Sequence, residues 1–75
     1  MTDHAEFATT FRVEHRLPSG SPRVLGEAPS MKTARDFAVR WRNLLRRLGG
    51  TGIVAVVNVA TGTAVAVVQI DRSPW

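Results

Sequence analysis

The chain has 75 residues and no cysteine, and its ten basic and six acidic side chains give a net charge of +4 at neutral pH. A chain of this length forms one small domain with a thin core, and without cysteine it has neither disulfides nor thiolate metal sites. Oligomerisation is the remaining way to stabilise so small a fold. No apolar run approaches the ~20 residues that span a bilayer. We therefore expect one soluble, cytoplasmic domain over residues 1–75, with residues 1–5 disordered.

Two short strands joined by a turn are expected in the N-terminal third. Residues 7–17 alternate between apolar and polar side chains, which is typical of a strand, with Phe11, Val13 and Leu17 facing the core. The turn-forming residues that follow include two prolines, so the chain must reverse there. Residues 23–27 are long enough for a short return strand, although a glycine within them weakens that prediction.

The clearest element is a helix over Ser30–Leu48. Ser30 can cap its first backbone N–H groups, and Gly49 and Gly50 end it, because glycine accepts the left-handed conformation that closes the last turn. Apolar residues recur every three to four positions and form a stripe that is expected to face the core. The members of this stripe are Ala34, Phe37, Ala38, Trp41, Leu44, Leu45 and Leu48.

The same helix carries most of the net charge, with six basic residues and one acidic residue. Helical geometry places Arg35, Arg42 and Arg46 on one flank, and the other basic residues spread over the back. Such a surface suits phosphates or acidic proteins, or it simply keeps the protein soluble. The candidate residues for binding a nucleic acid or an acidic partner are Lys32, Arg35, Arg40, Arg42, Arg46 and Arg47.

A β-hairpin is expected over Ile53–Val59 and Thr63–Asp71, where β-branched residues dominate. A two-residue Thr61-Gly62 turn would place Ile53, Ala55 and Val57 on the same face as Ala66 and Val68. A loop one residue longer would exchange the faces of one strand relative to the other. Valines lie on both faces in either register, and one helix can cover only one face.

The uncovered face of the hairpin is therefore expected to mediate self-association. At least one of Val54 and Val56 is expected to point outward. The candidate residues for self-association are Val54, Val56, Val65 and Val67.

Together these elements predict an α+β fold in which one helix packs across a small antiparallel sheet, in the order ββαββ, or βαββ if residues 23–27 stay irregular. No histidine or carboxylate is placed by the sequence to activate a serine. The glycines at 50 and 52 follow a helix, whereas a dinucleotide-binding loop precedes one. Two histidines and a glutamate, His4, Glu6 and His15, share no fixed geometry that would hold a metal. We expect no enzyme, cofactor, metal or small-molecule substrate.

Two functional hypotheses remain. In the first, the protein is a protein-interaction module, an accessory or regulatory protein that forms a homodimer or binds another protein through its sheet. In the second, the arginine-rich helix contacts the phosphates of DNA or RNA. No membrane partner is expected. Trp75, the last residue of the sequence, is a candidate anchor that covers a strand edge or docks into a partner.

Overall fold

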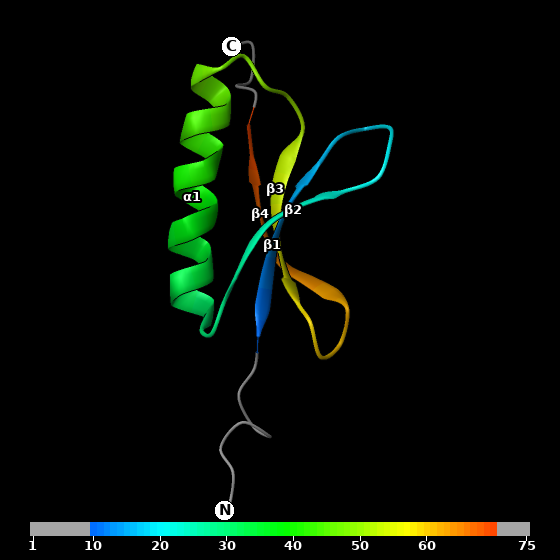
Figure 1. The fold of residues 1–75 in the computed structure, drawn as a ribbon, viewed down its shortest axis with the longest axis vertical. Coiled ribbons are helices and arrows are strands. Elements are labelled where there is room, and N and C mark those ends of the chain that lie inside the picture. Colours follow the sequence, from blue (N-terminus) through cyan, green and yellow to red (C-terminus); the bar gives the residue numbers. More distant parts are fainter. Residues whose placement is uncertain (1–9, 71–75) are drawn as a thin grey trace, which may run out of the picture.

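The computed structural model describes residues 10–70, in which two hairpins flank one helix (Figure 1). The elements are β1 (Phe11–Arg16), β2 (Arg23–Ala28), α1 (Met31–Arg47), β3 (Ile53–Asn58) and β4 (Thr63–Gln69). The four strands form one antiparallel sheet in the order β2-β1-β3-β4, and α1 lies across one face of it (Figure 1). The predicted ββαββ order is thus confirmed, and the return strand before the helix is formed.

The helix begins and ends where local sequence signals place its ends. The Ser30 hydroxyl accepts a hydrogen bond from the Thr33 N–H at 3.2 Å and thereby caps the first turn. At the other end, Gly49 has a φ of +81°, which a side chain would make costly. The Gly50 N–H then donates to the Leu45 carbonyl at 2.7 Å, so one of the last free carbonyls is satisfied.

The core lies between α1 and the facing side of the sheet. Ala34 and Ala38 are the fully buried residues of the helix, and their small side chains let it approach the strands closely. Half-buried Phe11, Phe37 and Trp41 pack around this centre. The buried apolar residues of the cluster are Val13, Ala28, Ala34, Ala38, Val54, Val56 and Ile70.

The hairpin of β3 and β4 has the longer-loop register, with an irregularity in the ladder next to Val57. Ala66 pairs with Val56 and Ala64 pairs with Val57, so Val65 is the extra residue of a bulge. Val54 and Val56 consequently face α1 and are buried in the core. The expectation that one of these two valines points outward is therefore wrong, because their odd-numbered neighbours occupy the outer face instead.

The apolar stripe of the helix is only partly covered. Leu44 and Leu48 are exposed, and Leu17, which follows β1, is exposed as well. The hairpin of β1 and β2 turns away from the C-terminal half of α1 (Figure 1), as the twist of a sheet requires of its outer strands. These three leucines were expected in the core, and the divergence of the hairpin is the reason that they are not.

One close contact gives a sharp test of this packing. A Cβ atom added at Gly26 would lie 2.6 Å from Cε2 of Phe37, so we expect Gly26→Ala to destabilise the fold by about 1–3 kcal/mol. In a Phe37→Leu background the ring atom is absent, and the same substitution should cost much less. Denaturant unfolding of the four proteins measures the coupling, and equal losses in both backgrounds would contradict the contact.

Candidate interaction site

The sheet face opposite α1 has an apolar half, formed by β3 and β4. Ala55 and Val57 point to this side from the inner strand β3 and are buried by their neighbours. On β4, Val65 and Val67 are 43% and 54% exposed. Val67 pairs with Ala55, whose side chain is too short to cover it. The β4 patch, defined as Val65 and Val67, thus leaves two valines exposed on a face that no element within residues 10–70 covers.

The other half of this face is charged and internally paired. Glu14 on β1 is only 5% exposed and lies between Arg12 and Arg16, two positions away on the same strand face. The Arg12 Nε donates to one carboxylate oxygen at 2.7 Å, and the Arg16 Nε donates to the other at 3.0 Å. Each oxygen of the carboxylate therefore has its own guanidinium partner, and the three side chains cover β1.

The protonation of Glu14 depends on its hydrogen bonds with Arg12 and Arg16, an arrangement that we call the Glu14 clasp. Burial of the carboxylate raises its pKa, but the hydrogen bonds from Arg12 and Arg16, with their charge attraction, outweigh burial and hold the pKa below its ordinary value. Glu14 is therefore ionised at neutral pH, and its charge is balanced within the strand. The two arginines outnumber the one carboxylate, so the three side chains keep a net charge of +1.

Arg35, Arg42 and Arg46, the basic residues predicted to share one flank of the helix, differ in what they contact. Arg46 binds the end of the sheet, because its Nε donates to the Ile70 carbonyl at 2.7 Å and its Nη2 to the Gln69 carbonyl at 3.3 Å. The Arg42 Nε donates to the Asn43 side chain at 2.9 Å. Arg46 thus joins α1 to β4, a role that its place on the helical wheel did not suggest.

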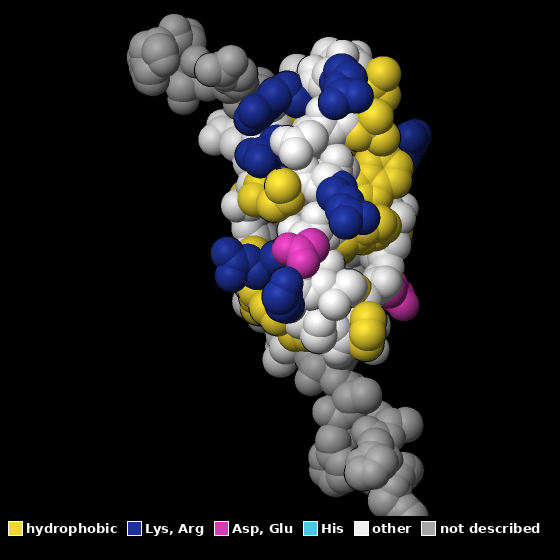
Figure 2. All heavy atoms as spheres, turned by 90° about the vertical axis from the view of Figure 1, so that its left-hand side faces the viewer, with side chains coloured by type: hydrophobic (Ala, Val, Ile, Leu, Met, Phe, Trp, Pro, Cys, Tyr) yellow, Lys and Arg dark blue, Asp and Glu magenta, His cyan; other side chains and the backbone are white. Residues whose placement is uncertain are grey.

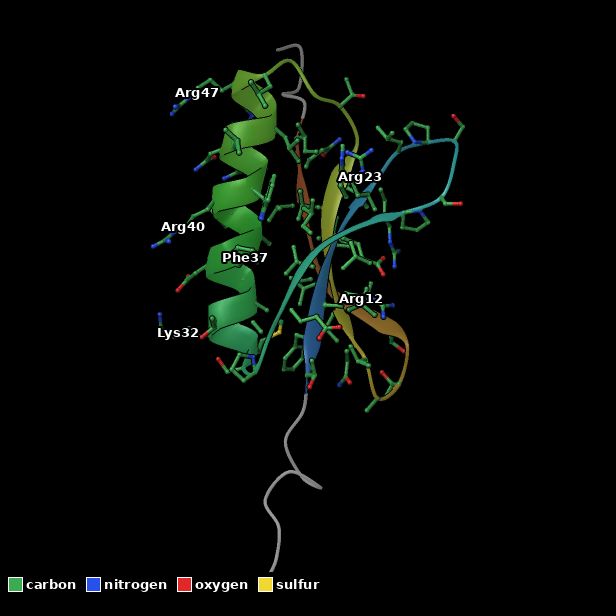
Figure 3. All side chains as sticks on the ribbon, viewed as in Figure 1. Arg12, Arg23, Lys32, Phe37, Arg40 and Arg47 are labelled. Carbon is green, nitrogen blue, oxygen red and sulfur yellow. The ribbon has the colours of Figure 1, made fainter. Side chains whose placement is uncertain are left out.

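The remaining basic side chains are spread along the helix (Figure 2). Lys32, Arg40 and Arg47 point away from the sheet (Figure 3). Lys32 also forms an exposed ion pair with Asp36, at 3.2 Å. Arg35 is exposed and borders a groove between α1 and β4. Of the six candidate residues, Arg46 therefore holds the helix to the end of β4, and most of the others face solvent.

A second apolar surface follows one side of the helix and was missed by the sequence analysis. It consists of Phe37, Trp41, Leu44 and Leu48, which we call the helix flank. The two rings meet edge to face, with centroids 6.3 Å apart. Hydrophobic side chains are visible along one margin of the helix face in Figure 2. The width of the apolar stripe could have indicated this surface, because seven apolar residues are more than a narrow twisted sheet can cover.

Enclosed sites for small ligands are scarce within residues 10–70. The groove between α1 and β4 holds about 90 Å³, below the volumes typical of ligand pockets. Two larger hollows, of about 470 Å³ beside Lys32 and Asp36 and about 340 Å³ beside Leu17 and Ile53, are open to solvent. No group of three or more ligating side chains in this range could hold a metal ion. The His15 Nε2 lies 2.9 Å from the Thr51 carbonyl oxygen. His4, Glu6 and Trp75 lie outside the described residues. None of the helices in the described part of the chain has the length and apolar character needed to cross a membrane.

The Glu14 clasp predicts an acid-dependent loss of stability. Because the folded-state pKa lies below the ordinary value of 4.5, the carboxylate stabilises the fold above that value, and the contribution is lost as the pH falls through the folded-state pKa. We expect Glu14→Gln to cost about 1 kcal/mol at pH 7 and to reduce the difference in stability between pH 7 and pH 3. Urea unfolding at both pH values measures this.

The matched control is Asp36→Asn, which removes the carboxylate of an exposed ion pair. It should change stability at pH 7 by only a few tenths of a kcal/mol. A Glu14→Gln protein with the same acid sensitivity as the parent would contradict the role of the clasp.

No family model, no curated protein and no solved structure matches this chain. What the molecule does has to be argued from its own surfaces.

Proposed function

We propose that this protein is a small non-enzymatic interaction module, an accessory or regulatory protein that self-associates through the β4 side of its sheet. The observation that carries the proposal is the exposure of Val65 and Val67 on a face that no helix or strand of the described part of the chain covers. A solvated antiparallel face normally alternates with polar residues, whereas β4 has the sequence TAVAVVQ and is apolar on both sides. Burial against another apolar surface would remove both valines from water.

A second copy of the chain is the partner that these observations favour. The β4 patch is uncharged and apolar, so it is compatible with itself, and two-fold pairing is the commonest closed arrangement of identical chains. Glu14 offsets one of the two positive charges of Arg12 and Arg16, so these three side chains keep a net charge of only +1 in each copy and their repulsion is limited. Association also compensates for the thin core of a chain this short.

The helix flank extends this proposal to a further protein partner. It lies on the opposite side of the sheet from the outward-facing β4 valines, so self-association there leaves Trp41 and Leu44 accessible. Half-buried aromatic residues beside exposed leucines are typical of surfaces that receive another protein. A module with one surface for its own copy and another for a different protein fits an accessory role.

Solution mass tests the self-association. At about 100 μM the parent protein should be a dimer, and Val67→Lys should shift it to monomer, because an interface core disfavours a charge. Sedimentation equilibrium with circular dichroism separates dissociation from unfolding. The matched control is Val24→Lys on β2, at a position 55% exposed and also on a strand. This control should remain dimeric, and a monomeric parent protein would overturn the proposal.

A second candidate function is binding to nucleic acid phosphates. Lys32, Arg40 and Arg47 support it, because they point away from the sheet along the full length of α1 (Figure 3). Guanidinium and ammonium groups on such a surface suit phosphate oxygens without reading bases. Arg46 is not offered for this role, since it hydrogen-bonds the main chain at the end of β4.

Binding to DNA and RNA should then be weak, independent of sequence and steeply dependent on salt. Replacing Lys32, Arg40 and Arg47 together with glutamine should lower the log–log salt slope by about one unit for each lost contact. Fluorescence anisotropy at two salt concentrations measures the slope. The control is Arg12→Gln on the opposite face of the molecule, which should bind like the parent. An absence of binding at ~50 mM salt, where screening is weak, excludes this function.

A further inference from the structure

We propose that the second copy joins along the free edge of β4, so that one antiparallel sheet runs through both chains. The inference rests on the proposed self-association. It adds which strand forms the contact between the two copies, in which register the strands pair, and which hydrogen bonds join them. An alternative is face-to-face stacking of the outer faces, which would bury the same valines without strand pairing. Edge pairing joins main-chain groups of the two β4 strands, whereas stacking brings only side chains of the two outer faces into contact.

The two edges of the sheet differ in their protection against another strand. The β2 edge follows Pro22 and precedes Pro29, and it contains the charged residues Arg23 and Glu27. Prolines and charges are the usual means by which proteins block an edge. The β4 edge contains neither, since all of its residues are apolar or uncharged. Of the two sheet edges within residues 10–70, β4 is therefore the one less protected against a further strand.

The hydrogen bonds of β4 show which main-chain groups face the free side. The Ile70 N–H donates to the Gly52 carbonyl at 3.0 Å, so residue 70 bonds toward β3. In an antiparallel ladder every second residue does so, and the intervening ones direct their N–H and C=O groups away. Val67 and Gln69 therefore present main-chain groups at the free edge. Consistently, the Gln69 carbonyl accepts from Arg46, a residue outside the sheet.

The bulge fixes the stretch that a partner strand can follow. It interrupts the ladder between Ala64 and Ala66, with Val65 as the extra residue, which leaves residues 66–69 as the regular part of the edge. Within that stretch the main-chain groups of Val67 face the free edge, whereas the Gln69 carbonyl is bound by Arg46. A two-fold axis at Val67 sets it opposite the Val67 of the second copy, and Val65 opposite Gln69. The Val67 pair exchanges two main-chain hydrogen bonds. The flanking positions contribute less, because the Gln69 carbonyl is already bound by Arg46 and Val65 lies in the bulge.

The side chains at this junction are compatible on both faces. On the outer face the two Val67 side chains become neighbours, and their exposed surface is covered. On the helix side Ala66 lies opposite Val68, next to the groove between α1 and β4 that Val39 also lines. β4 itself has no charged side chain that would have to leave water, and the charge next to the edge is that of Arg46 at its C-terminal end.

Disulfide trapping tests the register. The chain has no native cysteine, so Val67→Cys introduces a single thiol that should form a linked dimer readily under mild oxidation. Opposed residues in an antiparallel pair have Cα atoms about 5.5 Å apart, within the range that a disulfide bridges. Val65→Cys is the matched control, because in this register the two copies of residue 65 lie about 13 Å apart. It should form at least tenfold less linked dimer in the same time.

A main-chain test is independent of thiol chemistry. Val67→Pro removes an N–H that faces the free edge and is not needed within the chain, so the helix signal should persist while the protein becomes monomeric. Val67→Thr keeps the N–H and should stay dimeric. A dimeric Val67→Pro protein, or one in which only Val65→Cys is linked, would overturn edge pairing.

Failure of this inference is distinct from failure of self-association. If the parent is a dimer that Val67→Lys dissociates but Val67→Pro does not, the copies stack face to face and edge pairing is wrong. If the parent is a monomer, both proposals fail together.

Discussion

The close approach of α1 to the middle of the sheet is the constraint on which the rest of the structure depends. Ala34 and Ala38 make it possible, because an alanine keeps the helix axis near the strand that carries Val54 and Val56. Larger side chains at these two positions would lift the helix and open the core. With the centre fixed, the bulky Phe37 falls to the β2 side, where Gly26 leaves room for its ring.

This arrangement also determines what stays uncovered. A single helix covers only one face of the sheet and reaches the outer strands of that face poorly. Apolar surface therefore remains on β4, on the opposite face, and on the helix flank. Arg46 compensates in part by binding the main chain at the end of β4, which ties the last helical turn to an edge strand. The β4 patch and the helix flank are thus both consequences of covering a four-stranded sheet with one helix.

The fold could be predicted from the sequence where the determining signals are local. Ser30 and Gly49 set the helix ends through their own backbone and side-chain chemistry, and alternation within each segment indicated the strands. The faces of Val54 and Val56 could not be assigned, because they depend on the loop length and on the bulge at Val65. A shift of one residue reverses which side of a strand is core.

Side-chain partners across the fold were beyond the reach of sequence patterns for a different reason. Helical geometry gives the direction of Arg46, but only the position of β4 shows that two carbonyls lie within its reach. In the same way, the period of the apolar stripe cannot show that the twisted sheet diverges from Leu44 and Leu48. Both the Arg46 contact and the exposure of these leucines depend on how the helix and the strands are placed relative to one another, and the sequence of a single segment does not determine that.

The central place of β1 has a consequence for the way the chain acquires its structure. Its partner on one side, β2, follows directly, but its partner on the other side, β3, comes only after the helix. During synthesis the first hairpin can form early, yet β1 keeps an open edge until β3 has emerged. The non-local pairing of Val13 with Val56 then closes the core in one cooperative step. A ribosome-bound chain that stops before β3 would expose β1 and be prone to aggregation.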